Sequence, residues 1–246
     1  MAAAAAARIR GAIPPAKAQA WLAAIDAHPA WRRAGDRGDD FNAHSSSLRL
    51  AAVAGLDIIS AVAAYVLASE LGTLCRDRLG SELACNIDQC WVRRQYAPDH
   101  YPPGHAPHSW HQDGALGFDF LGASAPPPAD ALLSMLTCWI ALTPCGKDAP
   151  GLEFVDREFD TLLPLEALAD AAVRARHHER EFSRPAMATG DALVFGGGVL
   201  HHTHVRPAMH LDRTSLELRF FAAGCIPERL HQDRLPHLTP TPETCR

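Results

Sequence analysis

Two histidine-rich windows lie far apart in the sequence, and each holds residues that could bind a metal ion. The first window contains His100, His105, His108 and His111, and the second contains His201, His202, His204 and His210. His111 and Asp113 are separated only by Gln112. Residues i and i+2 point to the same side of an extended backbone, so these two side chains could reach one ion.

Two histidines and one carboxylate on one side of a metal leave the opposite coordination positions open. This arrangement suits iron(II), because O₂ must bind beside a cosubstrate. We therefore predict a mononuclear non-haem iron(II) oxygenase whose metal is held by His111, Asp113 and His201. The His-x-Asp spacing alone is a weak signal, since a surface histidine beside a solvated aspartate produces the same pattern.

The residues around the second window add to this signal. Gly190 and Asp191 predict a turn that leads into a strand over residues 192–195, and a glycine-rich loop then reaches His201. Thr203 follows His201 by two positions, so its hydroxyl could share that side of the chain. The pattern predicts that His201 and Thr203 line the same site.

The segment over residues 213–221 alternates polar with mostly apolar residues. Its polar positions are Arg213, Ser215, Glu217 and Arg219. This face could simply meet the solvent, but we favour a fold in which the apolar face packs on helices and the polar face lines a funnel. A buried arginine there is costly unless a carboxylate pairs with it. A bidentate carboxylate ligand would supply hydrogen bonds of roughly 1.5–3 kcal/mol each.

The elements that must position these residues begin with helices and continue with short strands. Helices are predicted over residues 16–28, 55–83 and 163–176, and strands over 90–96, 132–142, 192–195 and 213–221. Such a pattern favours a mainly-β double-stranded β-helix, the jelly roll also used by cupins, with N-terminal and inserted helices outside. We expect a single domain over residues 1–246. Its parts would be a mostly helical segment over 1–84 that packs on the barrel, a jelly-roll core over 85–225 and a C-terminal tail over 226–246, with residues 1–10 frayed.

Composition excludes several classes of protein. Of the 246 residues, 48% are hydrophobic and 21% charged, as in soluble globular proteins, and the net charge of −5 argues against a nucleic-acid partner. The uncharged part of the apolar stretch, residues 58–69, is about half of the ~20 residues that a membrane span needs. Residues 1–10 do not resemble a signal peptide. The odd number of scattered cysteines, 7, indicates free thiols in a reducing cytoplasm rather than a zinc ribbon.

At these motifs the sequence resembles the phytanoyl-CoA dioxygenase-like family of iron(II)/2-oxoglutarate oxygenases. The resemblance rests on residues 111–114, 138–142, 190–195 and 201–220 in that order. It implies iron(II) at His111, Asp113 and His201, and 2-oxoglutarate at Arg213, Thr203 and Trp139, with Gln112 as a further contact. The implied reaction oxidises a small-molecule substrate with O₂, while 2-oxoglutarate is decarboxylated to succinate and CO₂. Because related halogenases lack the metal-binding carboxylate, Asp113 favours hydroxylation.

The sequence departs from the family pattern in three places. His202 replaces the usual glycine after the distal histidine, Leu152 and Glu153 stand where a Ser-His pair is common, and Arg213 lies one residue farther from His201. These departures leave the substrate open, since related enzymes act on acyl-CoA thioesters, amino acids, phosphonates and secondary metabolites.

Further residues are candidates for contacts with the substrate. They are Arg93, Arg94, Trp110, His202 and Arg219. Arg213 is preferred over Arg219 as the 2-oxoglutarate anchor, because ~3.3 Å per residue puts Arg219 about 20 Å farther along the strand and too far from the metal. The sequence indicates no oligomeric state.

Two other functions use the same histidines. A zinc hydrolase would need a general base near the metal and would give a buried Arg213 no role. A cupin-like metal-binding protein without turnover would not need an open coordination face. Succinate release in the presence of iron(II) and 2-oxoglutarate separates the three hypotheses.

Overall fold

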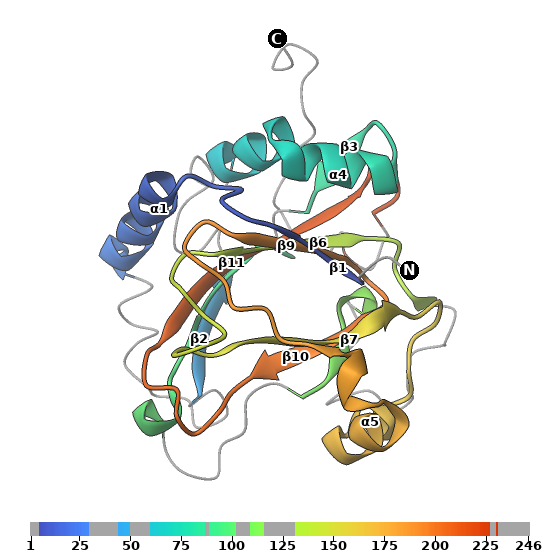
Figure 1. The fold of residues 1–246 in the computed structure, drawn as a ribbon. Coiled ribbons are helices and arrows are strands. Elements are labelled where there is room, and N and C mark those ends of the chain that lie inside the picture. Colours follow the sequence, from blue (N-terminus) through green and yellow to red (C-terminus); the bar gives the residue numbers. More distant parts are fainter. Residues whose placement is uncertain are drawn as a thin grey trace.

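The computed structural model describes residues 5–29, 44–49, 60–86, 89–101, 109–115, 131–226 and 230. Two antiparallel sheets lie face to face (Figure 1). The larger sheet contains, in order, β1 (Ala6–Ile9), β9 (Ala192–Gly196), β6 (Leu136–Ala141), β11 (Arg213–Ala222), β4 (Trp91–Gln95) and β2 (Ser45–Arg49), with β3 (Leu83–Cys85) paired to β11. The smaller sheet contains β5 (His111–Gln112), β10 (Val199–His204), β7 (Gly151–Glu158) and β8 (Phe182–Ser183). This arrangement confirms the predicted mainly-β jelly-roll fold.

Helices cover the outer faces of the two sheets. In Figure 1, α1 (Pro15–Ala27) and α4 (Glu70–Leu79) lie over the larger sheet, and α5 (Asp170–Arg176) lies beside the smaller one. Pro15 occupies the first turn of α1, where a missing N–H costs no hydrogen bond. The helix expected over residues 16–28 is thus confirmed within one residue at each end.

The helix expected over residues 55–83 is interrupted. Within its described part, residues 60–68 are helical and a new helix, α4, begins at Glu70. The Ser69 hydroxyl caps α4 by accepting a hydrogen bond from the Leu71 N–H at 3.2 Å. Gly72 permits the close approach of the two segments, because a Cβ there would lie 2.1 Å from the Leu67 carbonyl oxygen. The prediction of one continuous helix over residues 55–83 is therefore wrong, and its last helical residue is Leu79.

The main hydrophobic core lies between the helices and the larger sheet. Leu216, Leu218 and Phe220 of β11 are fully buried in it, together with Ile25 of α1 and Leu71 of α4. The alternate residues of β11 point away from this core into the space between the sheets. The predicted division of this strand into an apolar face against helices and a polar face lining a funnel is confirmed.

The N-terminus does not fray over its described part. Residues 6–9 form β1, which pairs with the edge of β9. The Asp191 carboxylate secures this strand by accepting hydrogen bonds from Arg8 Nη2 at 2.8 Å and from the Gly11 N–H at 2.8 Å. The expectation of a frayed start missed this long-range anchor, which an alanine-rich segment does not reveal.

Other predicted elements differ in extent. Residues 163–176 hold a 3-10 helix (Leu165–Leu168) followed by α5, because Ala169 between them is extended at φ −63° and ψ 136°. The strand expected over residues 132–142 begins only at Leu136. Among the described residues, seven strands lie outside the four predicted strand ranges: β1, β2, β3, β5, β7, β8 and β10. Three predicted features lie outside the described residues: His105, His108 and most of the C-terminal tail.

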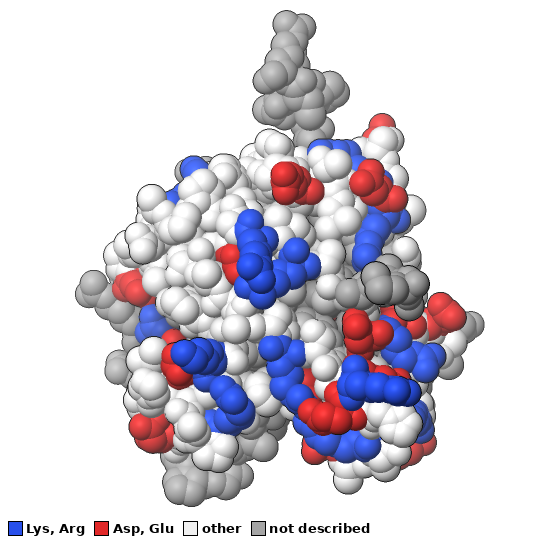
Figure 2. All heavy atoms as spheres, viewed as in Figure 1, with Lys and Arg blue, Asp and Glu red and all other residues white. Residues whose placement is uncertain are grey.

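The following features concern the charged surface, the length of the helices and the cysteines. Figure 2 shows basic and acidic side chains interspersed on one face of the molecule, with both signs gathered around α5. Within the described ranges, no helix is long and apolar enough to span a membrane. The six described cysteines are free, as predicted, and five of them are buried.

Candidate metal centre

Backbone pairing between two strands brings the predicted metal ligands together. β5 pairs with β10 so that His111 lies opposite His201, and their ring centroids are 4.3 Å apart. Asp113 follows β5 in a 3-10 turn, and its Oδ1 lies 3.9 Å from Nε2 of each histidine. The three ligand atoms lie within 4.8 Å of one another, which no other described group of His, Cys, Asp or Glu achieves. They are close enough for one ion with ligand bonds of about 2.0–2.3 Å.

Hydrogen bonds fix the ligand atom of each imidazole. His111 Nδ1 lies 2.8 Å from the Ser109 carbonyl oxygen, and His201 Nδ1 lies 3.0 Å from the Val199 carbonyl oxygen. Since only a protonated Nδ1 can donate to a carbonyl, each Nε2 keeps its lone pair for a metal. The ring of Phe154 stacks on His201 at 5.7 Å and restricts its rotation further.

The carboxylate of Asp113 is held by its other oxygen. The Thr137 hydroxyl donates to Asp113 Oδ2 at 2.5 Å, and Arg219 Nη2 lies 3.2 Å from the same atom. Asp113 is 6% exposed, so these bonds compete little with water. With Oδ2 engaged, Oδ1 is the oxygen that faces the two histidines and is the one that would bind a metal.

Electrostatics place these groups in the protonation states that a metal requires. Burial raises the pKa of Asp113, but Arg219, both histidines and Thr137 together lower it well below its ordinary value. Burial, with help from the neighbouring His111, lowers the pKa of His201 to about 4. At neutral pH the site therefore offers neutral imidazoles and an ionised carboxylate, as metal binding demands.

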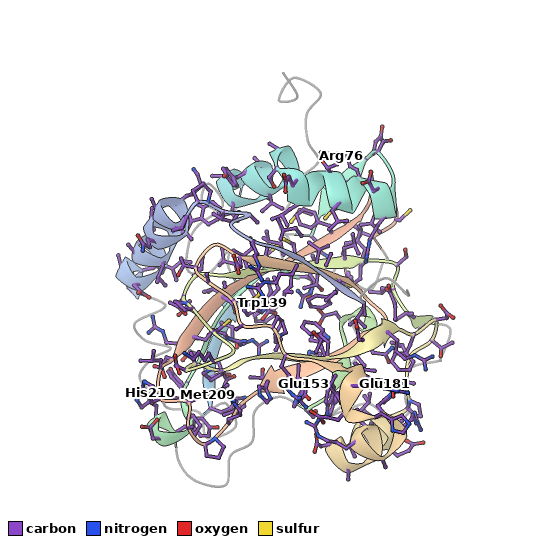
Figure 3. All side chains as sticks on the ribbon, in the orientation of Figure 1. Arg76, Trp139, Glu153, Glu181, Met209 and His210 are labelled. Atoms are coloured by element: carbon purple, nitrogen blue, oxygen red, sulfur yellow. The ribbon has the colours of Figure 1, made fainter. Side chains whose placement is uncertain are left out.

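A cavity of about 250 Å³ adjoins the three ligands between the two sheets. Its walls include Arg93, Trp139, Leu152, Phe195, Thr203, Arg213, Glu217 and Arg219. Trp139 points from the larger sheet into this space (Figure 3). The cavity thus joins most of the residues that the sequence indicated for the metal and the cosubstrate.

Arg213 lies in this cavity as a buried cation. Its side chain is 0% exposed, and no carboxylate within the described ranges forms an ion pair with it. Its Nη1 donates to the Gly151 carbonyl oxygen at 3.3 Å, while Nε has no hydrogen-bond partner among the described residues. The guanidinium lies 5.2 Å from the centre of the Trp139 ring. Burial lowers the pKa of Arg213 to about 10, so the group is still charged at neutral pH and can accept an anion.

The predicted contact residue Gln112 points away from the cavity. Its Nε2 donates to the carbonyl oxygens of Thr161 and Gly198 at 3.0 and 3.2 Å, and its Oε1 accepts from the Leu163 N–H at 2.6 Å. All of its amide groups are thus engaged with the backbone. Gln112 positions the segment that carries the ligands and does not reach the cosubstrate pocket.

Three of the candidate substrate contacts also lie outside the cavity. Trp110 stacks on His202 with ring centroids 4.0 Å apart, and His202 Nε2 lies 2.7 Å from a carboxylate oxygen of Glu153. Arg94 pairs with Asp26 of α1 at 2.6 Å. Only Arg93 and Arg219 among these candidates line the cavity.

The expectation that Arg219 is too far from the metal site is wrong. It assumed that the start of β11 lies nearest to the ligands. β10 and β11 belong to opposite sheets, and Arg219 lies opposite Thr137 of β6, at the end of β11 where Asp113 lies. Distance along one strand therefore did not measure distance to the metal.

A buried carboxylate behind the metal site was missed. Glu153 is 0% exposed and accepts hydrogen bonds from both Nη atoms of Arg174 at 2.9 and 2.8 Å. Arg184 Nη2 lies 2.5 Å from Glu153, whose place near β10 and α5 can be followed in Figure 3. The alternation of Leu152, Glu153 and Phe154 in a strand would have placed the acid on the outer face.

Comparison with known proteins identifies the family. The family model described as phytanoyl-CoA dioxygenase matches residues 6–205. The chain belongs to the phytanoyl-CoA dioxygenase family. No match was found among proteins with curated descriptions.

Solved structures share the fold at low identity. The epimerase SnoN from nogalamycin biosynthesis, in complex with Fe³⁺, alpha ketoglutarate and nogalamycin RO, is 15% identical with a TM-score of 0.62 over 89% of this chain and 80% of SnoN. EctD from S. alaskensis with 2-oxoglutarate and 5-hydroxyectoine is 16% identical with a TM-score of 0.59 over 90% and 73%. HygX from Streptomyces hygroscopicus with nickel and 2-oxoglutarate is 13% identical with a TM-score of 0.59 over 90% and 84%.

Family membership decides among the three functions that the sequence left open. A phytanoyl-CoA dioxygenase family member with a His-Asp-His site is an iron(II)- and 2-oxoglutarate-dependent oxygenase, not a zinc hydrolase or a metal-binding protein without turnover. Its cosubstrates are 2-oxoglutarate and O₂.

Proposed function

We propose that this chain is a dioxygenase in which His111, Asp113 and His201 hold iron(II), and Arg213 anchors 2-oxoglutarate. The observation that carries the proposal is the convergence of Asp113 Oδ1 with both Nε2 atoms, each 3.9 Å away. The remaining polar atoms of these side chains are engaged by backbone carbonyls, Thr137 and Arg219. Three ligands from one side leave the cavity side open for the cosubstrate and O₂.

The proposed site for 2-oxoglutarate runs from the metal to Arg213. This diacid can place one carboxylate at the metal and the other at the buried guanidinium, which has no carboxylate partner among the described residues. Thr203 is 4% exposed and lines the cavity, so its hydroxyl can contact the same ligand. Trp139 contributes a wall and an Nε1–H that lacks a hydrogen-bond partner in the described part of the chain. Charge-assisted bonds to Arg213 would contribute about 1.5–3 kcal/mol each.

The protein's own part in the reaction is to bind, orient and shield. Iron bound here would supply O₂ activation coupled to the decarboxylation of 2-oxoglutarate. Leu152, Phe195 and Trp139 give the cavity apolar walls that exclude water from the reacting groups. The proposed substrate is a small molecule, as in the neighbours EctD with 5-hydroxyectoine and SnoN with nogalamycin RO. Hydroxylation is the proposed outcome because Asp113 occupies the position that halogenases leave to chloride.

Anaerobic binding and aerobic turnover test this proposal together. Protein loaded with iron(II) should bind 2-oxoglutarate, seen as a charge-transfer absorbance band, and should release succinate when O₂ is admitted. Zinc(II) should support neither signal. An iron-loaded protein that neither binds 2-oxoglutarate nor forms succinate would refute the proposal.

A further inference from the structure

A second cluster of charge lies in the cavity, apart from Arg213. Arg93 Nε donates to Glu217 Oε1 at 3.2 Å, and Arg219 Nη2 donates to Glu217 Oε2 at 3.3 Å. One carboxylate thus bridges two guanidinium groups. All three side chains line the cavity, and Arg219 also contacts the metal ligand Asp113.

The guanidinium groups keep unused donors. Three of their nitrogen atoms are buried without a hydrogen-bond partner among the described residues. These are Nη1 of Arg93 and both Nε and Nη1 of Arg219. Arg219 is 4% exposed, so water does not satisfy it freely. Buried polar groups are normally hydrogen-bonded, so these unpaired donors beside the cavity need a partner that the described residues do not supply. Glu217 and Asp113 together contact only Nε of Arg93 and Nη2 of Arg219, so neither guanidinium group is fully paired.

The charge of the cavity indicates the sign of that ligand. Among the residues that the structure describes, Arg93, Arg213 and Arg219 line it together with two acids, Asp113 and Glu217, which is an excess of one positive charge. Iron(II) and doubly ionised 2-oxoglutarate cancel each other and leave this excess of one positive charge unchanged. A substrate with one negative charge would bring the net charge of the cavity, with iron(II) and 2-oxoglutarate bound, to zero. A doubly charged phosphate would make that net charge negative.

The two anion-binding regions are separated along β11. Arg213 and Arg219 are six residues apart on one face, which corresponds to about 20 Å between their Cα atoms. If Arg213 anchors 2-oxoglutarate, the unused donors of Arg219 lie at the other end of the site, beside Asp113. With one end at the metal and the other at Arg213, 2-oxoglutarate has no third carboxylate, so the unused donors of Arg93 and Arg219 are left for a second ligand.

We propose that the oxidised substrate carries a carboxylate group, which Arg93 and Arg219 bind beside the metal. The inference rests on the proposed function, because it places the substrate relative to iron and 2-oxoglutarate. Two guanidinium forks match a carboxylate in shape and charge. In the absence of substrate, Glu217 orients both guanidinium groups through its hydrogen bonds.

Matched probes test this inference without knowledge of the natural substrate. Anaerobic protein with iron(II) and saturating 2-oxoglutarate is titrated with butanoate and hexanoate, with the corresponding amides and with methylphosphonate, and binding is followed by calorimetry. The carboxylates should bind about tenfold to a hundredfold more tightly than the amides, as expected for charge-assisted hydrogen bonds. Equal binding of carboxylates and amides, or a preference for methylphosphonate, would overturn the inference while iron and 2-oxoglutarate binding still supported the proposed function.

Three variants assign the preference to the cluster. Arg93→Gln should lose the preference for carboxylates over amides and keep 2-oxoglutarate binding. Arg94→Gln is the matched control, because Arg94 points outward to Asp26, and it should keep the preference. Glu217→Gln removes the competing internal carboxylate and should raise carboxylate affinity, a gain that a folding defect cannot mimic. An Arg93→Gln protein with an unchanged preference, or a Glu217→Gln protein with weaker carboxylate binding, would contradict the inference. Failure of the wild-type protein to bind 2-oxoglutarate would overturn both proposals.

Discussion

The Nη2 atom of Arg219 lies 3.2 Å from Oδ2 of Asp113, the carboxylate oxygen that does not face the two histidines. Thr137 donates to the same oxygen. Together they fix the orientation of the carboxylate and keep it ionised, because both favour the charged form. Outer partners of this kind set the affinity of a metal site.

Replacing Thr137 should therefore weaken the metal site. Thr137→Val removes the hydroxyl but keeps the shape, and we expect iron(II) affinity to fall by about 10- to 100-fold. Thr137→Ser keeps the donor and serves as the control. Anaerobic titration with iron(II) measures the affinity. Equal affinity in Thr137→Val and wild type would show that Arg219 alone fixes Asp113.

The role of Arg213 predicts a selective loss of cosubstrate binding. Arg213→Ala should weaken 2-oxoglutarate by roughly 30-fold or more, since truncating one partner of a buried charge pair costs about 2–5 kcal/mol. Arg213→Lys keeps the charge without the planar fork and should raise the apparent KM with iron binding preserved. Arg206→Ala is the control, because Arg206 donates to the Lys147 carbonyl oxygen outside the cavity. Normal 2-oxoglutarate binding by Arg213→Ala, with loss in Arg219→Ala, would move the anchor to Arg219.

Glu153 should contribute to stability in a pH-dependent way. Burial raises the pKa of Glu153, but hydrogen bonds from Arg174 and His202 and the nearby His204 lower it below the ordinary value. A lowered pKa in the folded state gives stability that is present above the unfolded pKa of about 4.3 and is lost as the pH falls below it. We expect Glu153→Gln to lose stability at pH 7 and to approach wild type in acid.

At pH 7, Glu153→Gln should lower the free energy of unfolding by about 2–4 kcal/mol, somewhat less than the loss of one partner in a fully buried ion pair. The expected effect is smaller because the side chains of Arg174 and Arg184 are 35% and 31% exposed, so solvent screens their charges. Urea unfolding at pH 7 and at pH 3.5 measures the difference. Glu179→Gln is the control, because this acid pairs with Arg184 at the surface and should matter little. A constant difference between wild type and Glu153→Gln at both pH values would contradict the ionised state of Glu153.

The metal ligands and the polar face of β11 could be predicted from local sequence. The His-x-Asp spacing places His111 and Asp113 together through backbone geometry alone, and alternation separates Arg213 from its apolar neighbours. Thr203 follows from the same rule. The directions of these side chains follow from the local backbone geometry.

The contacts of Arg219, Gln112 and Glu153 could not be predicted in this way. Arg219 reaches Asp113 because β11 pairs with β6 while β5 pairs with β10 in the other sheet, and such long-range pairing leaves no local signature. Gln112 bonds to backbone carbonyls 49 and 86 residues away along the chain. The partners of Glu153 come from α5, β10 and the segment after β8, so the apolar neighbours of Glu153 in sequence hide its role.

The central claim is that Asp113 and the two histidines hold the iron that couples 2-oxoglutarate to oxidation. Succinate formation by iron-loaded wild type, Asp113→Ala and Asp99→Ala tests it most directly. Asp99 is the matched control, because its side chain is 68% exposed and lies beside His100, outside the cavity. We predict that wild type and Asp99→Ala form succinate and that Asp113→Ala does not, with all three proteins folded by circular dichroism. Wild-type succinate formation by a folded Asp113→Ala protein would contradict the metal site itself.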